Sequence, residues 1–538
     1  MKKFFLFTGI IFAFTMLCIF MIEKTDPLGL ANIKLEPTFK ETDGTMMLSW
    51  KRLPYPCFYR IETYSHTTGL VKGEPEYHLF ASEFTMDASY QIPRTAIPMF
   101  YRVSAYGMFG RLTGPSAPIA NPNYPDPPVP IAIYHYTDAN PASLMPFLVW
   151  HKVPTAVCYE VELLSGPPDA EGGIARSKKN HLESTRAVFT NGWQADLRSY
   201  QNQPALYWRV RALGLHHEPI GEFSQAERIV IQPDLPMPDA PLINNFDQMP
   251  NFRQPIYPVY EWIPIHDMTK YEVELMIHPP KHPNDTLPDP ERVWHMVTSD
   301  VASCYDEYAR PYAGDYYWRV RAVDEDEHTI GHYSDAEHFI MPPLPARVDV
   351  VLFGDSIAHG GGALSYSPAS LEYDITTYLD FPVLNLGRSG DTAHMTLERF
   401  DTDVLPLHPK NLLILTGSNS LRSAAISAED VIGDLAEIEQ KCEKNDIRPI
   451  FLTLMPINPA NIRFAFHTDT DPAWKEKLED INDFLRKRPY HIDLEPYFYD
   501  STHTVLDYHL AVDGLHPDLK GKMLIAEIIN AYKNLLRE

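Results

Sequence analysis

A pattern of aromatic residues recurs three times in the first 343 residues of this 538-residue chain. In each copy a tryptophan is followed nine positions later by a tyrosine, which begins a segment of alternating polar and apolar residues. The pairs are Trp50–Tyr59, Trp150–Tyr159 and Trp262–Tyr271. Alternation with a period of two predicts half-buried β-strands. Self-similarity at fixed landmarks therefore predicts three copies of one all-β unit, spaced 100 and 112 residues apart.

A second landmark lies later in each copy, where an aromatic residue is followed by Arg-Val-x-Ala. The three segments are Tyr101-Arg-Val-Ser-Ala, Trp208-Arg-Val-Arg-Ala and Trp318-Arg-Val-Arg-Ala. A turn follows each, and we expect a further strand to begin at Ser116, Ser224 or Ser334. Many short strands around a buried tryptophan are typical of a β-sandwich, so we predict that the aromatic landmarks are core residues.

These landmarks resemble those of fibronectin type III domains. The resemblance implies three all-β, immunoglobulin-like sandwiches, which we place at residues 33–122, 126–234 and 237–343 and call the first, second and third repeats. Such modules serve as spacers or bind proteins or carbohydrates, so a glycan or a protein ligand stays open for them. An acidic run at residues 324–328 lacks the spacing of a calcium loop, and we expect a solvated turn there.

Proline is distributed unevenly between these repeats and the rest of the chain. Residues 1–345 hold 38 of the 49 prolines, and three proline-rich joints separate the expected domains. The joints lie at residues 124–130, 233–238 and 342–345. Because proline breaks helices and central strands, this distribution fits turns and stiff linkers between sandwiches.

Charge and cysteine content exclude several classes of function. The net charge of −25 opposes non-specific binding of nucleic acid, which requires a basic surface. The five cysteines are odd in number, are far apart in the sequence and contain no Cys-x-x-Cys pair. We therefore expect neither a disulfide framework nor a zinc ribbon.

An uncharged apolar run extends from Phe4 to Ile22, directly after two lysines. Nineteen helical residues span roughly 28 Å, which matches the hydrocarbon core of a bilayer. The run is longer than that of a cleaved signal peptide and lacks a small-x-small site. We expect residues 1–25 to be a signal anchor that crosses the membrane through residues 4–22.

Everything after this segment is then expected outside the cytoplasm, at a bacterial cell surface. Secretion after cleavage is the alternative. Lipid attachment at Cys18 is disfavoured because the preceding Leu17 is not small.

The pattern changes in the last 193 residues, where short apolar segments alternate with helical stretches. We expect strands at residues 348–353, 383–386, 412–416, 450–454 and 492–494. Ser427 and Asp430 predict a capped helix, Asp471-Pro472 predicts the start of another, and a C-terminal helix should bury Leu524, Ile528, Ala531 and Leu535. Strands that alternate with helices predict a doubly wound parallel sheet, with ligands at the carboxyl ends of its strands.

Polar motifs follow the first three of these strands, and a fourth precedes the last helix. They are Gly354-Asp-Ser356, the run from Asn385 to Thr392, Gly417-Ser-Asn419 and Asp513-Gly-Leu-His516-Pro517. A hydrolytic serine needs a base, a group that orients the base, and donors for an oxyanion. Ser356 on a tight turn can be that nucleophile, His516 can accept its proton and Asp513 can hold the imidazole tautomer.

The four motifs in this order resemble the SGNH, or GDSL-type, serine hydrolase superfamily over residues 346–538. The resemblance implies a flavodoxin-like, three-layer α/β fold without a cofactor or metal. It makes Ser356 the nucleophile, His516 the base and Asp513 its orienting partner. Ser356, Gly390 and Asn419 would then form the oxyanion hole. Ser420 departs from the family pattern, which has aspartate there, and this puts the rigidity of the loop in doubt more than the activity.

Competing interpretations of this region have weaker support. Asp391 and Arg422 could line the site, although structural hydrogen bonds are the simpler role for both. His359, His394 and His467 lack the Asp-x-x-His-Pro context of His516. The turn at 354–362 does not read Gly-x-Gly-x-x-Gly, no P-loop lysine follows it, and His-Glu-x-x-His is absent from the sequence.

We therefore predict an extracytoplasmic serine esterase that forms an acyl-enzyme, with an acylated small molecule or polysaccharide as substrate. An acetylated glycan is the favoured ester. A lipase or lysophospholipase and a sugar O-acyltransferase are the alternatives. A surface binding or scaffold protein with an inactive hydrolase domain is the alternative from another class, and the complete triad argues against it.

Overall fold

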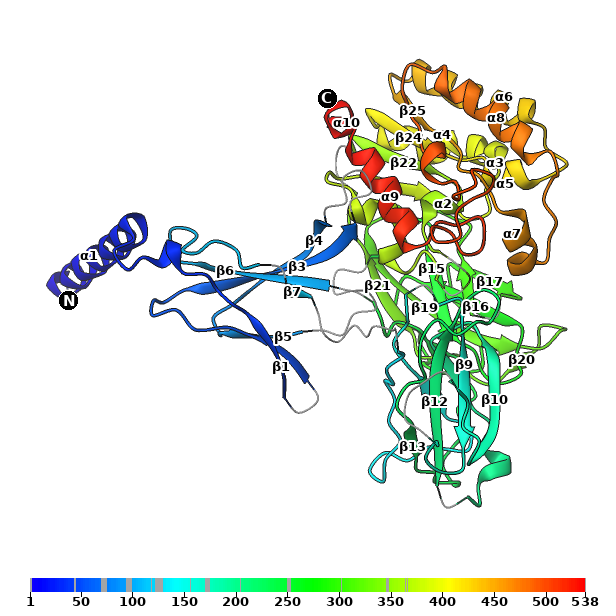
Figure 1. Ribbon diagram of the computed structural model, residues 1–538, viewed down its shortest axis with the longest axis horizontal. Coiled ribbons are helices and arrows are strands. Elements are labelled where there is room, and N and C mark those ends of the chain that lie inside the picture. Colours follow the sequence, from blue (N-terminus) through cyan, green and yellow to red (C-terminus); the bar gives the residue numbers. More distant parts are fainter. Residues whose placement is uncertain are drawn as a thin grey trace. The chain divides into compact units, whose positions relative to one another are not determined.

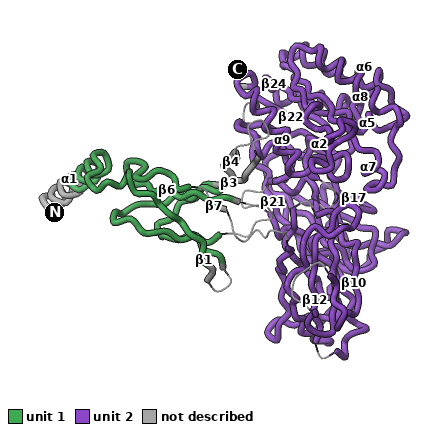
Figure 2. The backbone as a smooth tube through the Cα atoms, in the orientation of Figure 1, with its two compact units in different colours: residues 1–126 green, residues 127–538 purple. Residues whose placement is uncertain are grey.

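The computed structural model describes residues 2–537, apart from short gaps. The gaps are 43–44, 69–74, 93–98, 118, 121–128, 155, 170–174, 204, 249–252, 301, 345–347, 363 and 365. The chain forms two compact units, residues 1–126 and 127–538 (Figure 2). Most of the expected joint at 124–130 lies outside the described residues, and the placement of the other domain boundaries stays a prediction.

The first unit contains one long helix and two antiparallel sheets. Helix α1 spans Lys2–Thr25. The strands are β1 (Thr38–Thr42), β2 (Thr45–Ser49), β3 (Phe58–Thr68), β4 (Pro75–Thr85), β5 (Ser89–Gln91), β6 (Met99–Tyr106) and β7 (Ile119–Ala120), in the orders β1-β2-β5 and β4-β3-β6-β7.

Helix α1 covers the segment expected to be a signal anchor. The side chains of residues 2–13, and hence half of the expected span, lie outside the described part of the chain. Among the helices that are described, none has the length and apolar character needed to cross a membrane.

Two further pairs of antiparallel sheets occupy the first half of the second unit. In the second repeat the orders are β11-β8 and β10-β9-β12-β13; in the third they are β14-β15-β18 and β17-β16-β19-β20, with β21 also paired to β19. The strands are β8 (Phe147–Val149), β9 (Cys158–Leu164), β10 (His181–Val188), β11 (Gly192–Gln194), β12 (Leu206–Leu213), β13 (Glu227–Ile229), β14 (Leu242–Ile243), β15 (Val259–Ile263), β16 (Tyr271–Met276), β17 (Trp294–Thr298), β18 (Ser303–Tyr305), β19 (Gly314–Val323), β20 (Thr329–Ile330) and β21 (Glu337–Met341). Each repeat thus has two antiparallel sheets, while its assignment to the fibronectin type III class stays a prediction.

The aromatic landmarks are core residues, as the sequence predicts. The Trp–Tyr ring centroids lie 5.2 Å apart in the first repeat and 5.3 Å apart in the other two. The serine landmarks are also equivalent, because each hydroxyl accepts from the backbone N–H of the valine in Arg-Val-x-Ala, at 3.0, 3.0 and 3.1 Å. The strand that follows each serine begins three residues later than expected, at Ile119, Glu227 and Glu337.

The prediction of half-buried strands is wrong for β9 and β16, in which every residue is buried. Their glutamates lie opposite arginines of the neighbouring strand, in the pairs Glu162–Arg209, Glu160–Arg211, Glu274–Arg319 and Glu272–Arg321. Aromatic rings of Phe223 and Tyr333 cover these guanidinium groups. The polar face of the alternation is therefore a buried ladder of ion pairs, which the period of two does not distinguish from a solvated face.

The last part of the second unit contains a five-stranded parallel sheet with the order β23-β22-β24-β25-β26. Its strands are β22 (Val350–Gly354), β23 (Leu384–Gly387), β24 (Asn411–Leu415), β25 (Arg448–Leu452) and β26 (His491–Ile492), and all five expected strands are present. The α-helices are α2 (Ser356–His359), α3 (Ala393–Glu398), α4 (Phe400–Asp403), α5 (Ser418–Arg422), α6 (Ala428–Lys444), α7 (Pro459–Phe466), α8 (Trp474–Arg486), α9 (Leu519–Asn530) and α10 (Lys533–Arg537). Short 3-10 turns include η3 (Leu371–Tyr373) and η4 (Ile375–Tyr378).

Helices cover both faces of this sheet (Figure 1). On one face, Val351 and Phe353 pack with residues of α3, α4, α6 and α8. On the other, Val350 and Leu352 pack with residues of η4 and α9. Successive residues of β22 thus enter opposite cores, which is the burial pattern of a parallel strand covered on both sides.

Two of the three expected helices begin where the sequence predicts, and the prediction for the C-terminal helix is wrong in part. Ser427 and Asp430 form the predicted capping box of α6, and α8 begins at Trp474, just after Asp471-Pro472. The C-terminal helix ends at Asn530, whose side chain bonds Tyr378 and Asp380, and α10 is a separate helix. Ala531 is consequently exposed, and residues 521–526 and Ile529 form the buried face.

Candidate active site

The first polar motif forms a sharp turn at the carboxyl end of β22. A Cβ atom at Gly354 would lie 1.8 Å from the carbonyl oxygen of Leu415, so only glycine lets β22 and β24 approach this closely. Asp355 caps the short helix α2, whose first residue is Ser356. This turn places the Ser356 side chain, 8% exposed, above the edge of the sheet.

Ser356, His516 and Asp513 form a continuous chain of hydrogen bonds. The Ser356 Oγ atom lies 2.9 Å from His516 Nε2, and His516 Nδ1 lies 2.8 Å from Asp513 Oδ2. A carboxylate only accepts hydrogen bonds, so Nδ1–H donates to Asp513 and the unprotonated Nε2 accepts from the serine hydroxyl. This is the arrangement in which an imidazole can remove the proton of a serine.

The Asp513 carboxylate is held in place by its own loop. Its Oδ1 atom accepts from the backbone N–H groups of Leu515 and His516, both at 2.8 Å, and only 1% of the residue is exposed. One oxygen thus shapes the turn while the other faces the imidazole. The three-residue spacing in the sequence follows from this turn.

Asp355 also belongs to this site, although the sequence analysis did not predict it as a site residue. Its Oδ1 accepts from Ile357 N–H at 3.0 Å, and its Oδ2 accepts from the N–H groups of Gly417 and Ser418, both at 3.2 Å. Burial raises the pKa of this carboxyl to about 6, against the opposing effect of these bonds. Asp355 therefore joins the serine turn to the loop after β24, and its place in the Gly-Asp-Ser motif is the signal that could have found it.

Gly390 and Asn419 follow β23 and β24, the two strands that flank β22 in the sheet. Gly390 is exposed and has a φ of +87°, a backbone conformation that favours glycine. The Asn419 side chain donates to the carbonyl oxygen of Asp391 at 3.0 Å, which fixes the orientation of its amide. The segments that follow β22, β23 and β24 carry Ser356, Gly390 and Asn419, and they therefore meet at one edge of the sheet.

Ser420 and Asp391 have structural partners. The Ser420 hydroxyl accepts from the N–H of Ala393 at 3.1 Å and so ties α5, which follows β24, to the start of α3. The fully buried Asp391 pairs with Arg388 and Arg399, both at 2.6 Å. Arg399 also donates to the carbonyl oxygen of Gly354 at 2.8 Å. Asp391 therefore supports the loops beneath the serine.

Phe466 lies beside the imidazole, and Arg422 lies over the Phe466 ring. The Phe466 ring packs edge-on against His516, with centroids 5.9 Å apart, and the Arg422 guanidinium lies 5.5 Å from the centre of the Phe466 ring. Phe466, from α7, was not predicted as a site residue, because nothing in the local sequence distinguishes it from a core aromatic.

The other three candidate histidines lie elsewhere. The Ser389 N–H donates to Nδ1 of His359 at 3.1 Å, so Nδ1 of this ring carries no proton. The proton is therefore on Nε2 of His359, which donates to the carbonyl oxygen of Tyr257 at 2.8 Å. Burial lowers the pKa of His359 to about 4, which keeps this ring neutral. His394 pairs with Asp434 on the surface, and His467 is an exposed residue at the end of α7. Of these histidines, His516 is the one bonded to Ser356.

An open groove lined by both polar and apolar side chains lies between the second and third repeats, apart from this site. Its volume is about 460 Å³. The lining residues are Glu183, Ser184, Thr185, Trp193, Gln194, Pro264, Ile265, His266, Asp267 and Met268. Trp193 is half-buried on β11, and Asp267 has an 83% exposed side chain.

Among the residues described, no group of three or more His, Cys, Asp or Glu side chains could hold a metal ion.

Comparison with known proteins finds a family match for the C-terminal part of the chain. Residues 352–524 match the GDSL-like Lipase/Acylhydrolase family. The family match identifies a GDSL-like acylhydrolase domain here, and this family indicates an ester hydrolase. The chain is also 31% identical, over 123 residues, to the uncharacterized lipoprotein YqeF of Bacillus subtilis strain 168; the match covers 21% of this chain and about half, 51%, of that relative.

Solved structures similar to this chain include three bacterial enzymes. A GDSL-like lipase from Bacteroides thetaiotaomicron is 19% identical, with coverage of 36% of this chain and 90% of that one and a TM-score of 0.29. The lipase/acylhydrolase from Enterococcus faecalis is 23% identical, with coverage of 35% and 96% and a TM-score of 0.29. Axe2, an acetylxylan esterase from Geobacillus stearothermophilus, is 17% identical, with coverage of 34% and 92% and a TM-score of 0.27.

Proposed function

We propose that the protein is a serine esterase that acts outside the cytoplasm and deacetylates a glycan. The observation that carries the esterase assignment is the hydrogen-bonded chain from Ser356 Oγ through His516 to Asp513. A serine beside an imidazole that is itself oriented by a carboxylate is the arrangement that activates a hydroxyl nucleophile.

The proposed reaction has two stages. His516 Nε2 takes the proton of Ser356 as Oγ attacks the ester carbonyl carbon, and the resulting imidazolium is stabilised by Asp513. The oxyanion is stabilised by the backbone N–H groups of Ser356 and Gly390 and by the Asn419 amide. His516 then protonates the leaving alkoxide, which departs and leaves an acyl-Ser356 ester. His516 then takes a proton from water as the water oxygen attacks the acyl carbon, and it returns that proton to Ser356 Oγ as the acid departs.

A glycan is favoured over a lipid by the groove between the second and third repeats. The half-buried Trp193 lines this groove, and a sugar ring can pack its C–H groups on an aromatic side chain. Glu183, Asp267 and His266 line the same groove and offer acceptors and a donor for sugar hydroxyls. A concave surface with one aromatic side chain and several polar groups is typical of a site that binds a polar ligand.

The proposed location outside the cytoplasm is supported by the apolar run at residues 4–22 and by the lipoprotein description of the YqeF relative. A glycan of the cell wall or of the surroundings would be accessible there. A protein that remains in the cytoplasm after cell fractionation would contradict this location.

The direct test compares the wild-type chain with Ser356→Ala on p-nitrophenyl acetate, p-nitrophenyl palmitate and acetylated xylan. We expect wild-type activity on the acetyl esters and a loss of at least a thousandfold in the variant. Equal rates for the two proteins would overturn the esterase assignment. A preference for the palmitoyl ester would overturn deacetylation and favour a lipase.

A further inference from the structure

The loop that carries Asp513 and His516 contacts the second repeat, about 300 residues earlier in the sequence. Val512, directly before Asp513, forms a small apolar cluster with Val157 and Leu215. These three side chains are only 8%, 2% and 3% exposed. Val157 and Leu215 flank β9 and β12, so a rigid sheet supports them.

A hydrogen bond lies beside this cluster. The Tyr508 hydroxyl donates to Oε1 of Glu218 at 2.9 Å, while Oε2 of Glu218 accepts from the backbone N–H of His216 at 2.9 Å. Glu218 is therefore held by its own turn and offers a fixed acceptor to the loop. The His216 ring also packs edge-on against Phe464 of α7, at 4.5 Å.

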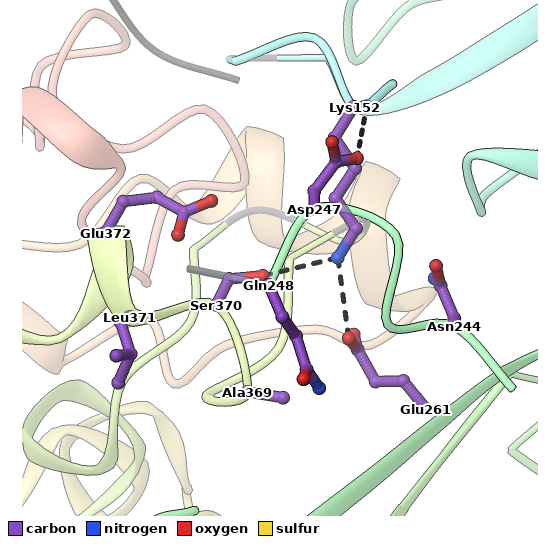
Figure 3. A pocket seen from close by; sticks show the side chains of 9 residues that line it. All are labelled: Lys152, Asn244, Asp247, Gln248, Glu261, Ala369, Ser370, Leu371 and Glu372. Carbon is purple, nitrogen blue, oxygen red and sulfur yellow. Dashed lines mark hydrogen bonds and ion pairs between the residues drawn. The ribbon is translucent and has the colours of Figure 1, made fainter. Parts of the chain in front are cut away.

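The segment after Ser356 is also bonded to residues of the second and third repeats. His359, the last residue of α2, donates to the Tyr257 carbonyl of the third repeat at 2.8 Å, and Tyr366 donates to the carbonyl of Val153. In the polar cavity of Figure 3, Lys152 from the second repeat donates to Ser370 at 3.2 Å and pairs with Glu261 at 3.4 Å. Both halves of the Ser356–His516 pair thus lie on segments that the repeats hold.

From these contacts we infer that the second repeat supports the catalytic centre from outside and that Leu215 and Glu218 are positioning residues for the Asp513–His516 loop. The inference rests on the proposed esterase function. Leu215 acts through Val512 and Glu218 acts through Tyr508. Neither residue touches the reacting atoms.

The physical reason is that the bond between Nε2 of His516 and Oγ of Ser356 tolerates little displacement. A misplacement of about 1 Å lowers the rate of an enzyme roughly a hundredfold. Within the hydrolase domain, Asn461 donates to the carbonyl of Val512 at 3.0 Å and holds one side of the loop. The Val512 side chain packs on the second repeat, so truncation of Leu215 opens a space into which this part of the loop can shift.

The test uses Leu215→Ala, Leu215→Met and Tyr508→Phe in the full-length chain, with p-nitrophenyl acetate as substrate. Leu148→Ala is the matched control, because Leu148 is fully buried in the core of the second repeat and belongs to a cluster without hydrolase residues. We expect Leu215→Ala to lower kcat about tenfold while KM changes less than twofold. Leu215→Met should restore most of kcat, because it keeps the volume. Tyr508→Phe should lower kcat two- to fivefold, and folded Leu148→Ala should keep the wild-type kcat.

Each outcome separates this inference from the proposed function. If Ser356→Ala is inactive but Leu215→Ala and Tyr508→Phe keep kcat within twofold, the esterase stands and the positioning role is overturned. An equal loss of kcat in Leu215→Ala and Leu148→Ala would show general destabilisation and would also overturn it. If Leu215→Ala does not fold, Tyr508→Phe decides, because it removes only the Tyr508 hydroxyl and its exposed hydrogen bond to Glu218 and keeps the ring. Activity that survives Ser356→Ala would overturn the proposed function itself.

Discussion

The imidazole of His516 lies 2.9 Å from the hydroxyl of Ser356, although 160 residues separate them in the sequence. The parallel sheet makes this possible, because Ser356 follows β22 while His516 lies on the loop before α9. Asp513, on that same loop, needs only a three-residue turn to reach the imidazole. The site is therefore assembled from one local turn and one long-range contact.

Replacement of Asp513 by asparagine should lower kcat by about three to four orders of magnitude with little change in KM. The asparagine amide can present a donor to Nδ1 of His516, which then favours the wrong tautomer of the ring. Steady-state kinetics on p-nitrophenyl acetate measure the effect. Asp480→Asn, on the exposed face of α8, is the control and should retain wild-type rates. A loss below tenfold in Asp513→Asn would contradict the proposed role of the carboxylate.

Replacement of Trp193 by alanine should raise KM for acetylated xylan about tenfold, which corresponds to about 1.4 kcal/mol of lost binding. The same variant should hydrolyse p-nitrophenyl acetate with unchanged kcat/KM, because that small ester does not reach the groove. Trp193→Phe, which keeps an aromatic face, should retain part of the polymer activity. The control is Phe189→Ala, an exposed aromatic outside the groove lining. Equal KM values for wild type and Trp193→Ala would rule out a glycan contact there.

Replacement of Glu372 by glutamine should stabilise the protein at pH 8 but hardly at pH 4.5. Burial, with the nearby Asp247 and Glu261 carboxylates, raises the pKa of Glu372 to about 7 against the attraction of Lys152. From pH 4.5 to 7 the unfolded chain loses this proton while the folded chain keeps it, so folding stability falls as the pH rises.

Glutamine does not ionise, so Glu372→Gln avoids the cost of a buried charge at position 372. At pH 8 the free energy of unfolding should therefore rise on the order of 3 kcal/mol. Thermal unfolding at pH 4.5 and 8 measures it, with the exposed Glu443→Gln as control. A difference between variant and wild type that does not change with pH would contradict the raised pKa.

Replacement of Arg319 by methionine should lower the free energy of unfolding by about 3 kcal/mol, because it leaves the charge of Glu274 buried with fewer partners. The two side chains lie 2.8 Å apart and are 1% and 0% exposed. Urea denaturation measures the loss. In the exposed pair, Arg463→Ala removes a partner of Asp469 and should cost less than about 1 kcal/mol. Similar losses for both variants would contradict a special role for the buried ladder.

Replacement of Ser420 by alanine should destabilise the protein by about 1–3 kcal/mol, because the buried N–H of Ala393 loses its acceptor. The kcat value should fall less than tenfold, since Asn419 keeps its bond to the Asp391 carbonyl. Denaturation midpoints and esterase assays separate the two effects, and the exposed Ser501→Ala is the control. A large loss of activity at unchanged stability would show that Ser420 acts in the reaction.

Local pattern alone sufficed for several features. The nine-residue Trp–Tyr spacing predicted core residues in each repeat, and Ser427 with Asp430 predicted the start of α6, because both depend on residues close in sequence. The motifs around Ser356 and His516 were also found, since strand ends in a parallel sheet share one edge. The same local logic failed for the last helix, where Asn530 is fixed by a partner 150 residues earlier.

Only the tertiary structure decided which polar residues are buried and what surrounds the site. The glutamates of β9 and β16 have the alternation of solvated residues, and they are buried because arginines of neighbouring strands lie opposite them. Asp355, Phe466 and Leu215 became visible as neighbours of the Ser356–His516 pair through contacts between distant segments. The sequence by itself determined the repeats, the parallel sheet and the choice of candidate site residues, because these follow from periodicity and short motifs. Long-range packing decided how those side chains are held, because it joins residues that no local pattern relates.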